Sequence, residues 1–311
     1  MKPARNLTPI LICGPTASGK SALGMAIANQ IGGCVINADA LQVYENWRVL
    51  SARPSIIDEQ HVSHRLYGHV AGDTHYSVGA WLRDVESQLD ALTNTGHTPI
   101  ILGGTGLYFS TLTQGLAQIP TIPVEIRLEG DRMRASSQTT EFIHELQKFD
   151  PQTLVNIDQN NPMRLQRAWE VWQSTNKGLF AWQKDTPAPL IALENAVPIV
   201  LNANTDWLNK RISGRFEQMI SDGAIAECQA VLEKGWDPAL PSSRALGAAE
   251  IIAYLQGENS LEQAKEKASI ATRQFAKRQR TWFRSKMKLW QHVDIEKKNT
   301  KDTVLKMLTE E

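Results

Sequence analysis

Short apolar runs recur along the chain and are separated by more polar stretches. Residues 9–13 (PILIC) are the first, and a continuous apolar run followed by glycine is typical of a buried parallel strand. Three later runs share this pattern: residues 33–38 (GCVINA), 97–102 (HTPIIL) and 198–202 (PIVLN). Residues 21–31 and 77–92 have the apolar spacing of helices. Strands that alternate with helices predict an α/β fold built on a doubly wound parallel sheet.

The pattern changes between the third and fourth predicted strands. Residues 120–195 are polar, have helical spacing and are rich in Gln, Asn and Arg, with prolines near both ends. We predict a helical insertion domain over this stretch, within a core formed by residues 1–119 and 196–311. Beyond residue 206 the pattern is helical, which predicts a helical C-terminal region.

Charge is balanced over the chain but unevenly placed. The 311 residues carry 33 basic and 33 acidic side chains, which excludes a protein that is basic throughout. Residues 264–290 nevertheless contain nine Lys or Arg and one acidic residue, with Trp282, Phe283 and Trp290 between them. Such a run is usually a solvated helix face. In a neutral chain it favours a surface that faces RNA phosphates, with aromatic rings available to stack on bases.

Few features point to a metal centre or a membrane. Cys13, Cys34 and Cys228 lack zinc-site spacing, and so sparse a set suits a reducing compartment. The N-terminus has no apolar signal-peptide core, and no stretch is apolar for long enough to span a bilayer. We expect a cytoplasmic protein that makes no membrane contact.

Residues 14–21 (GPTASGKS) match the P-loop pattern G-x-x-x-x-G-K-S/T at every fixed position. They follow a predicted strand and open a predicted helix, as the motif requires. Backbone N–H groups and the helix N-terminus would surround phosphate oxygens, Lys20 would add a positive charge, and Ser21 would hold Mg²⁺. The residues expected to bind phosphate are Gly14, Thr16, Ala17, Ser18, Gly19, Lys20 and Ser21.

A P-loop does not identify the phosphate compound that it binds. An NTPase usually has an apolar strand that ends in an aspartate for the Mg²⁺ shell. Here the third predicted strand runs into GGTG (residues 103–106) without one, whereas the second runs into NAD (residues 37–39). Because the carboxyl ends of parallel strands meet at one crevice, Asp39 and Thr105 are expected to face the phosphates held by Lys20.

These motifs together resemble those of the tRNA dimethylallyltransferase family, also called tRNA isopentenyltransferases. The resemblance covers nearly the whole chain, and its last two blocks named here are specific in combination. The matching segments are GPTASGKS (14–21), DALQVY (39–44), ARP (52–54), HRL (64–66), NNP (160–162) with Arg164, Arg167 and Ala168, the set Arg215, Met219 and Gly223, GGTGLY (103–108), and TRQFAKRQ (272–279) continued by TWFR (281–284).

The resemblance implies a reaction and its partners. A dimethylallyl group would pass from dimethylallyl diphosphate to the exocyclic amine of the adenosine 3′ of the anticodon in tRNA, releasing diphosphate. The P-loop would hold the substrate diphosphate, with Mg²⁺ as cofactor, rather than a nucleotide. The insertion and the C-terminal helices would grip the tRNA anticodon stem-loop, and we expect a monomer.

The resemblance also implies roles for single residues. Asp39 would accept a proton from the amine, a poor nucleophile because its lone pair is delocalised. Thr105 would lie near the bridging oxygen, and Arg244 would contact the diphosphate. The alternatives are a Mg²⁺ partner or helix N-cap for Asp39, a tight turn around Thr105, and a solvated surface position for Arg244. The residues expected to bind tRNA are Gln42 (which could equally brace its loop), Arg164, Arg167, Arg273, Gln274, Lys277, Arg278 and Arg284.

The chain departs from the family pattern at several positions. Ala40 stands in place of serine, which predicts weaker substrate binding, and Arg53 stands in place of lysine. The other departures are Leu50-Ser51 in place of Gly-Thr, Arg65 in place of a second histidine, and Asn161 in place of aspartate.

Three other functions compete with this hypothesis. A small-molecule P-loop kinase would bind and hydrolyse ATP, but the missing strand-end aspartate and the basic C-terminal stretch argue against it. A prenyltransferase for free adenine nucleotides would need neither an insertion nor a basic helix. A non-enzymatic RNA-binding module would not need Lys20, Ser21 and Asp39, all of which are present.

Overall fold

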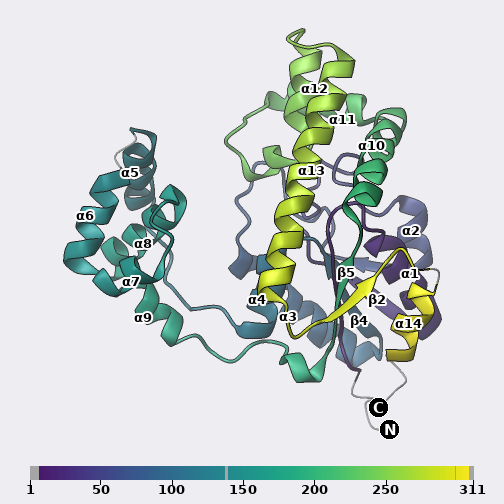
Figure 1. The fold of residues 1–311 in the computed structure, drawn as a ribbon, viewed down its shortest axis with the longest axis horizontal. Coiled ribbons are helices and arrows are strands. Elements are labelled where there is room, and N and C mark those ends of the chain that lie inside the picture. The colour runs from purple at the N-terminus through teal and green to yellow at the C-terminus, as the bar shows by residue number, and fades with distance from the viewer. Residues whose placement is uncertain (1–6, 137–138, 298, 308–311) are drawn as a thin grey trace. The chain divides into compact units, whose positions relative to one another are not determined.

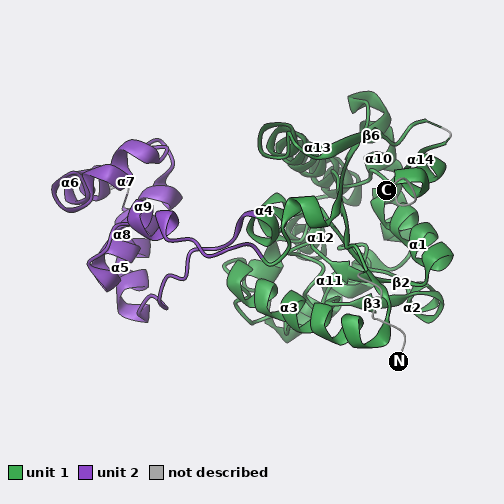
Figure 2. Ribbon diagram, turned by 90° about the horizontal axis from the view of Figure 1, so that it is seen from below, with its two compact units in different colours: residues 1–113, 190–311 green, residues 114–189 purple. Residues whose placement is uncertain are grey.

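The computed structural model describes residues 7–136, 139–297 and 299–307. The chain divides into two compact units, one of residues 1–113 with 190–311 and one of residues 114–189 (Figure 2). The second unit is the polar helical stretch, which we predicted over 120–195. Residues 190–195 belong to the first unit because Ile191 is buried in its core and donates its backbone N–H to the Leu112 carbonyl at 3.1 Å.

The first unit is built on a six-stranded sheet in which all neighbouring strands run parallel (Figure 1). The strand order is β3-β2-β4-β1-β5-β6. The strands are β1 (Ile10–Cys13), β2 (Gly33–Asn37), β3 (Ser63–Arg65), β4 (Thr98–Gly103), β5 (Val197–Asn202) and β6 (Gln291–Asp294). The four predicted strands are β1, β2, β4 and β5, and they confirm the α/β fold.

The sequence pattern did not reveal the two edge strands, β3 and β6. No residue of β3 is buried, and Val293 is the one buried residue of β6. An edge strand is covered on fewer sides than a central strand, so it carries no continuous apolar run.

Helices cover both faces of the sheet, which explains the continuous apolar runs of the central strands. Ile10 and Ile12 of β1 pack on one face, in a cluster with residues of α1 (Lys20–Ile31) and α14 (Thr300–Met307). Leu11 and Cys13 pack on the other face, in a cluster with residues of α3 (Val78–Thr95), α4 (Gly106–Gln114) and the end of α13 (Leu261–Lys286).

The C-terminal helices form a third layer beyond the carboxyl ends of the strands. They are α10 (Thr205–Ser221), α11 (Ala224–Gly235), α12 (Ala248–Leu255) and α13, and the short elements of this unit are α2 (Ile56–His61), η1 (Leu193–Asn195) and η2 (Pro241–Arg244). Their shared core includes Trp47 and Leu50 from the segment after β2 and Phe216 from α10. This core fixes the helices over the strand ends, where a ligand site is expected.

The second unit contains five helices among its described residues: α5 (Val124–Ala135), α6 (Thr139–Phe149), α7 (Pro151–Asn156), α8 (Pro162–Thr175) and α9 (Leu179–Lys184). It has a core of its own, in which Phe142, Leu165 and Trp169 are buried. The insertion is therefore helical, as predicted. Across the described parts of both units, we find no helix long and apolar enough to cross a membrane.

Candidate active site

The P-loop has the backbone geometry that phosphate binding requires. Strand β1 ends at Cys13, and α1 begins at Lys20 after Gly19, which has a φ of 87°. Only glycine adopts this left-handed conformation without strain. Within the described residues no side chain caps the start of α1, so its first N–H groups are open to an anion. The predicted strand–loop–helix context of the motif is confirmed.

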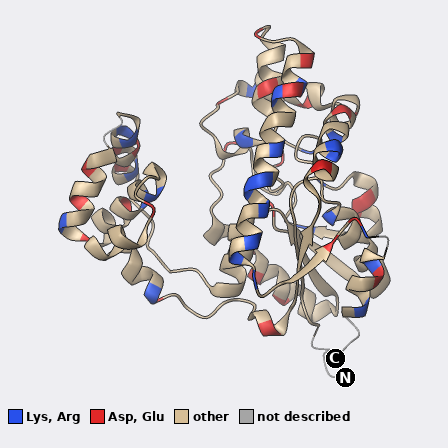
Figure 3. Cartoon of the chain, in the orientation of Figure 1, with Lys and Arg blue, Asp and Glu red and all other residues tan. Residues whose placement is uncertain are grey.

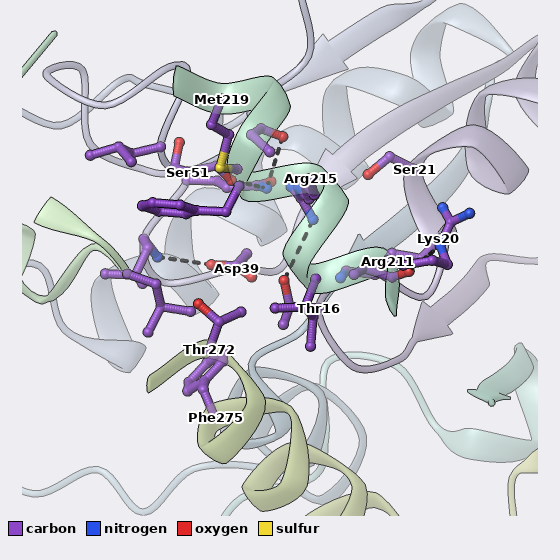
Figure 4. Close-up of a pocket in the computed structure, with 18 of the residues that line it drawn as sticks. Thr16, Lys20, Ser21, Asp39, Ser51, Arg211, Arg215, Met219, Thr272 and Phe275 are labelled. Carbon is purple, nitrogen blue, oxygen red and sulfur yellow. Dashed lines mark hydrogen bonds between the residues drawn. The ribbon is translucent and has the colours of Figure 1, made fainter. Parts of the chain in front are cut away.

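A cavity of about 350 Å³ opens beside the P-loop (Figure 4). Its walls come from the P-loop, the segment after β2, α10 and α13. In Figure 4, Lys20 and Arg211 lie on one side, and Asp39 lies on the other with Met219 and Phe275. Further apolar side chains that line the cavity are Leu41, Leu50, Ile212, Phe216 and Leu246. The cavity therefore suits a ligand with an anionic end and an apolar end.

Lys20 supplies a buried cation to this cavity. Its side chain is 8% exposed, and its Nζ donates to the Pro15 carbonyl at 3.3 Å. Burial lowers the pKa of Lys20 to about 8, Asp39 opposes the shift, and Arg215 adds to it. A phosphate placed here would supply the counter-charge that favours the protonated amine.

Two arginines of α10 reach the P-loop and were not assigned a role from the sequence. Arg211 donates from Nε to the Ala17 carbonyl at 2.8 Å, and Arg215 donates from Nη1 to Thr16 Oγ1 at 3.5 Å. Burial lowers the pKa of Arg215, and Asp39 opposes this shift. Their spacing of four residues places both on one helix face, and that spacing was the signal available in the sequence.

Asp39 is held at the end of β2 by a local network. Its backbone N–H donates to Asn37 Oδ1 at 2.9 Å, and its Oδ1 accepts from Leu41 N at 3.0 Å. Among the described residues its Oδ2 has no hydrogen-bond partner. No helix begins at Asp39, which excludes the N-cap alternative. One carboxylate oxygen is therefore fixed, and the other is free to accept a proton in the cavity.

Thr105 lies next to this segment but does not line the cavity. Its Oγ1 accepts the Ala40 N–H at 2.9 Å, and its own N–H donates to the Ala38 carbonyl at 3.1 Å. The structure thus places Thr105 against the segment that carries Asp39, as a brace, and not in the cavity wall, where it was predicted to face the phosphates. The Ala40 position is held through its backbone, which needs no serine hydroxyl.

Arg244 is not brought into the cavity. It is an exposed residue at the end of η2, between the buried Ser242 and Ala245. These buried neighbours anchor the turn and leave the arginine on the surface. Leu246, two residues further on, lines the cavity instead.

Gln42 lines the cavity but its amide is already engaged. Nε2 donates to the carbonyls of Ser51 at 2.8 Å and Ala52 at 3.2 Å. This is the bracing role that the sequence left as an alternative. The same loop is held from α11 by Glu227, whose carboxylate accepts the N–H groups of residues 48, 49 and 50 at 2.5, 3.0 and 2.9 Å. Leu50-Ser51 is thereby held in a defined conformation despite its departure from the family pattern.

Arg53 does not line this cavity. Its Nη1 donates to the carbonyls of Tyr44 at 3.2 Å and Glu45 at 3.3 Å, and its guanidinium lies over Gly68. At this position the arginine therefore packs the loop that carries it.

Helix α13 presents a basic face to solvent. Figure 3 shows positions of Lys and Arg, in blue, along the length of the helix. The predicted tRNA-binding residues of this helix are all exposed: Arg273, Gln274, Lys277, Arg278 and Arg284. In contrast, Phe283 and Trp290 are 2% and 6% exposed in the sheet core, so the expectation that these two rings stack on RNA bases is wrong. Phe283 lies on the inner face of α13, and Trp290 lies in the turn between α13 and β6.

The two remaining predicted tRNA contacts lie on α8 of the second unit. Arg164 is exposed, and Arg167 forms an ion pair with Glu170 at 3.6 Å. Asn161 caps this helix by accepting Arg164 N at 3.3 Å. Asparagine is as good an N-cap as aspartate, so this departure from the family pattern leaves the helix start intact.

Among the described residues of the site, one side chain is suited to bind a Mg²⁺ ion. In the ranges that the structure describes, no group of three His, Cys, Asp or Glu residues is placed to hold a metal. Ser21 is exposed and lines the cavity next to Lys20. A Mg²⁺ ion keeps several waters and binds readily through phosphate oxygens, so Ser21 fits as its single protein ligand.

Comparisons with known proteins agree with this geometry. The IPP transferase family model matches residues 42–286, and the isopentenyl transferase model matches residues 8–69. The tRNA dimethylallyltransferase of Dinoroseobacter shibae is 53% identical over 285 residues, covering 92% of this chain and 94% of that protein. The enzyme of the same name from Cereibacter sphaeroides strain ATCC 17029 is 51% identical over 287 residues, covering 92% of this chain and 89% of that protein.

Two solved structures share the fold of this chain. The tRNA isopentenylpyrophosphate transferase of Bacillus halodurans has a TM-score of 0.69 at 27% identity, covering 97% of this chain and 95% of that chain. A eukaryotic dimethylallyltransferase acting on tRNA shares the fold with a TM-score of 0.82 at 22% identity, covering 97% of this chain and 77% of that chain. This chain belongs to the tRNA dimethylallyltransferase family.

Proposed function

We propose that the protein transfers a dimethylallyl group from dimethylallyl diphosphate to the exocyclic amine of the adenosine 3′ of the anticodon in tRNA. The observation that carries this proposal is one cavity that combines the buried cation Lys20, two arginines, a carboxylate and an apolar wall. Relatives named tRNA dimethylallyltransferase, about half identical over nine-tenths of the chain, support the same reaction.

The cationic side of the cavity holds the leaving diphosphate. Lys20, Arg211 and Arg215 surround the P-loop, and the open N–H groups of α1 add further donors. These groups are fixed before the reaction, so they stabilise the negative charge as the carbon–oxygen bond breaks. When bound at Ser21, Mg²⁺ supplies additional neutralisation of the phosphate oxygens.

Asp39 acts on the accepting nitrogen. The amine forms a bond to the prenyl carbon, its proton moves to the free Oδ2 of Asp39, and diphosphate leaves with the electrons of the broken bond. Oδ1 keeps its hydrogen bond to Leu41 N, which holds the carboxylate in one orientation. The apolar residues Leu50 and Met219 provide a wall for the dimethylallyl group.

The basic face of α13 binds the tRNA. An adenosine in the anticodon loop is stacked and must leave the stack to enter an active-site cavity. Cationic side chains such as Lys277 and Arg278 are exposed for contact with the phosphate backbone. We expect the second unit to add contacts through Arg164 and Arg167, and we expect a monomer in the cytoplasm.

Label transfer from dimethylallyl diphosphate tests this proposal. Purified protein is incubated with Mg²⁺, labelled donor and unmodified tRNA, with Asp39→Asn as the variant and Asp90→Asn, an exposed residue of α3, as the control. We expect transfer by the wild type and the control and its loss in Asp39→Asn.

Parallel reactions with AMP and ATP identify the alternatives. Label on AMP without label on tRNA would indicate a nucleotide prenyltransferase. Hydrolysis of ATP alone would indicate a kinase, and tRNA binding without any turnover would indicate a non-enzymatic RNA-binding module.

A further inference from the structure

Gln279 is a buried polar residue on the inner face of α13. It is 6% exposed, whereas its neighbours Lys277 and Arg278 are exposed on the basic face. A buried amide is costly unless both its donor and its acceptor are satisfied. Its partners therefore indicate why the residue is polar.

The amide of Gln279 joins two loops that end different strands. Its Oε1 accepts the backbone N–H of Thr16 in the P-loop at 2.8 Å. Its Nε2 donates to the backbone carbonyl of Gly104, which follows β4, at 2.9 Å. Thr16 is 263 residues away in sequence and Gly104 is 175 away, so this one side chain spans three separate segments.

The glycines after β4 permit this close approach. A Cβ on Gly104 would lie 2.4 Å from Gln279 Nε2 and 3.1 Å from Asp39 Oδ2, and a Cβ on Gly106 would lie 2.2 Å from Trp282 Cδ1. Neither glycine has a positive φ, so a turn conformation is not what requires them. Glycine is needed because α13 packs directly on the loop, which also touches the proposed base.

We propose that Gln279 is a positioning residue that fixes the P-loop, and the diphosphate in it, relative to Asp39. This inference rests on the proposed function. A reacting carbon and nitrogen must be held near the bonding distance, and small misplacements of one partner slow the reaction greatly. Glutamine suits the task because an amide accepts from one loop and donates to the other while remaining neutral beside Asp39.

The test separates positioning from binding and from folding. Gln279→Leu removes both hydrogen bonds at similar volume, and Gln229→Leu changes an exposed glutamine of α11 as the matched control. Affinity for inorganic diphosphate and for an anticodon stem-loop RNA is measured by titration, and the transfer step is measured in a single turnover. Thermal unfolding reports whether each variant is folded.

We expect Gln279→Leu to slow the single-turnover step by roughly 10- to 100-fold and to leave both affinities unchanged. Gln229→Leu should match the wild type in every measurement. A Gln279→Leu variant that folds and keeps the wild-type transfer rate would overturn the proposal. So would a variant that loses affinity for diphosphate or RNA in proportion to its loss of rate, because the role would then be in binding.

Gln279→Glu provides a second test that does not depend on the leucine variant. When ionised, this carboxylate still accepts from Thr16 N but cannot donate to the Gly104 carbonyl. When protonated, it does both. Burial and Asp39 would raise the pKa of a glutamate here, and Lys20, Arg211, Arg215 and the arginines at 278 and 280 would lower it.

We expect the rate of Gln279→Glu, divided by the wild-type rate at each pH, to rise as the pH falls. The same ratio for Gln279→Leu should stay constant, because leucine does not titrate. A constant ratio for Gln279→Glu would contradict the role assigned to the donated hydrogen bond. The wild-type protein in the same assay separates the positioning role of Gln279 from the proposed function. If the wild type transfers nothing to tRNA, the proposed function itself is contradicted.

Discussion

Lys20 shows how a single residue prepares the site for an anion. It is a buried cation whose nearest hydrogen-bond partner is a carbonyl, at 3.3 Å, and burial lowers its pKa to about 8. The positive charge is therefore incompletely compensated before a ligand arrives. A bound phosphate compensates it and favours the protonated form.

This electrostatic state predicts a pH dependence of diphosphate binding. A bound anion raises the pKa of Lys20, so affinity is complete below the free-state value of about 8 and falls as the pH rises through it. Titration of the protein with inorganic diphosphate across this range measures the effect. Lys20→Met should bind weakly and lose this step, whereas Lys301→Met, an exposed control on α14, should keep it. If the affinity of Lys20→Met for diphosphate still falls through the same pH range, a group other than Lys20 causes the pH dependence.

The same lysine predicts a gain of stability in alkali. Its pKa of about 8 in the folded chain lies below the value of about 10.4 in an unfolded chain. Between these values the unfolded chain binds more protons, so the free energy of unfolding rises with pH. The buried thiols of Cys13 and Cys228 oppose this contribution, because burial raises their pKa values and the unfolded chain ionises first. Denaturant titrations at several pH values should therefore show a free energy of unfolding that falls more steeply with pH in Lys20→Met than in the wild type.

Single residues of the site differ in how far the sequence could predict them. Lys20 and Asp39 follow from contiguous motifs at strand ends. Arg211, Arg215 and Gln279 do not, because their roles depend on partners more than 170 residues away. Such pairings arise from the packing of helices over the sheet. The four-residue spacing of Arg211 and Arg215 indicates a shared helix face but not the loop that this face contacts.

At the scale of elements, the cavity wall depends on a loop held by a helix. The backbone N–H groups of residues 48, 49 and 50 all donate hydrogen bonds to the carboxylate of Glu227 in α11. Trp47 adds a hydrogen bond from its indole nitrogen to the Ser242 carbonyl at 2.9 Å, and its ring is fully buried. The C-terminal layer therefore holds this loop in place, although the loop follows a strand of the sheet.

Removal of the Glu227 carboxylate should destabilise the loop that lines the cavity. We expect Glu227→Ala to lower the free energy of unfolding by roughly 3 kcal/mol, because partly buried N–H groups lose a charged acceptor. It should also raise the KM for dimethylallyl diphosphate, since Leu50 lines the cavity. Chemical denaturation and steady-state kinetics measure both effects. Glu233→Ala, at an exposed position on the same helix, should change neither the free energy of unfolding nor the KM. If the two variants behave alike, Glu227 does not hold the cavity loop.

Helix α13 has an exposed basic face and a buried face, and the exposed face is the one proposed to bind tRNA. Replacing Lys277 or Arg278 by alanine should weaken the binding of every tRNA to a similar degree and lower the salt dependence of log K by about one unit per phosphate contact. Binding titrations at several salt concentrations measure the slope. Lys301→Ala should leave it unchanged, and an unaltered slope in the α13 variants would place the RNA elsewhere.

At the scale of the whole molecule, the two units have separate cores. Leu165 is fully buried in the second unit, and every residue that lines the proposed diphosphate cavity lies in the first. We expect Leu165→Ala to destabilise the second unit by about 2–5 kcal/mol, to reduce transfer to tRNA and to leave the affinity for inorganic diphosphate unchanged. Calorimetry and diphosphate titration test this. Loss of diphosphate binding would show that the units do not behave independently.

The overall architecture was largely predictable, for a physical reason. Central strands that are buried on both faces must be apolar, so β1, β2, β4 and β5 are visible in the sequence. Edge strands and segment ends carry weaker patterns, and β3, β6 and the return of residues 190–195 to the sheet core were missed. Phe283 and Trp290 were predicted to face RNA and are buried, because composition does not show which side chains of a basic stretch face the core.

Locating the product on the tRNA tests the central claim most directly. Unmodified tRNA is treated with the protein, Mg²⁺ and dimethylallyl diphosphate, digested with a nuclease and analysed by mass spectrometry. We predict one dimethylallyl group on the exocyclic amine of the adenosine 3′ of the anticodon, and none when that adenosine is replaced by guanosine. A modification at another nucleotide, or none on tRNA in the presence of intact diphosphate binding, would contradict the assigned reaction.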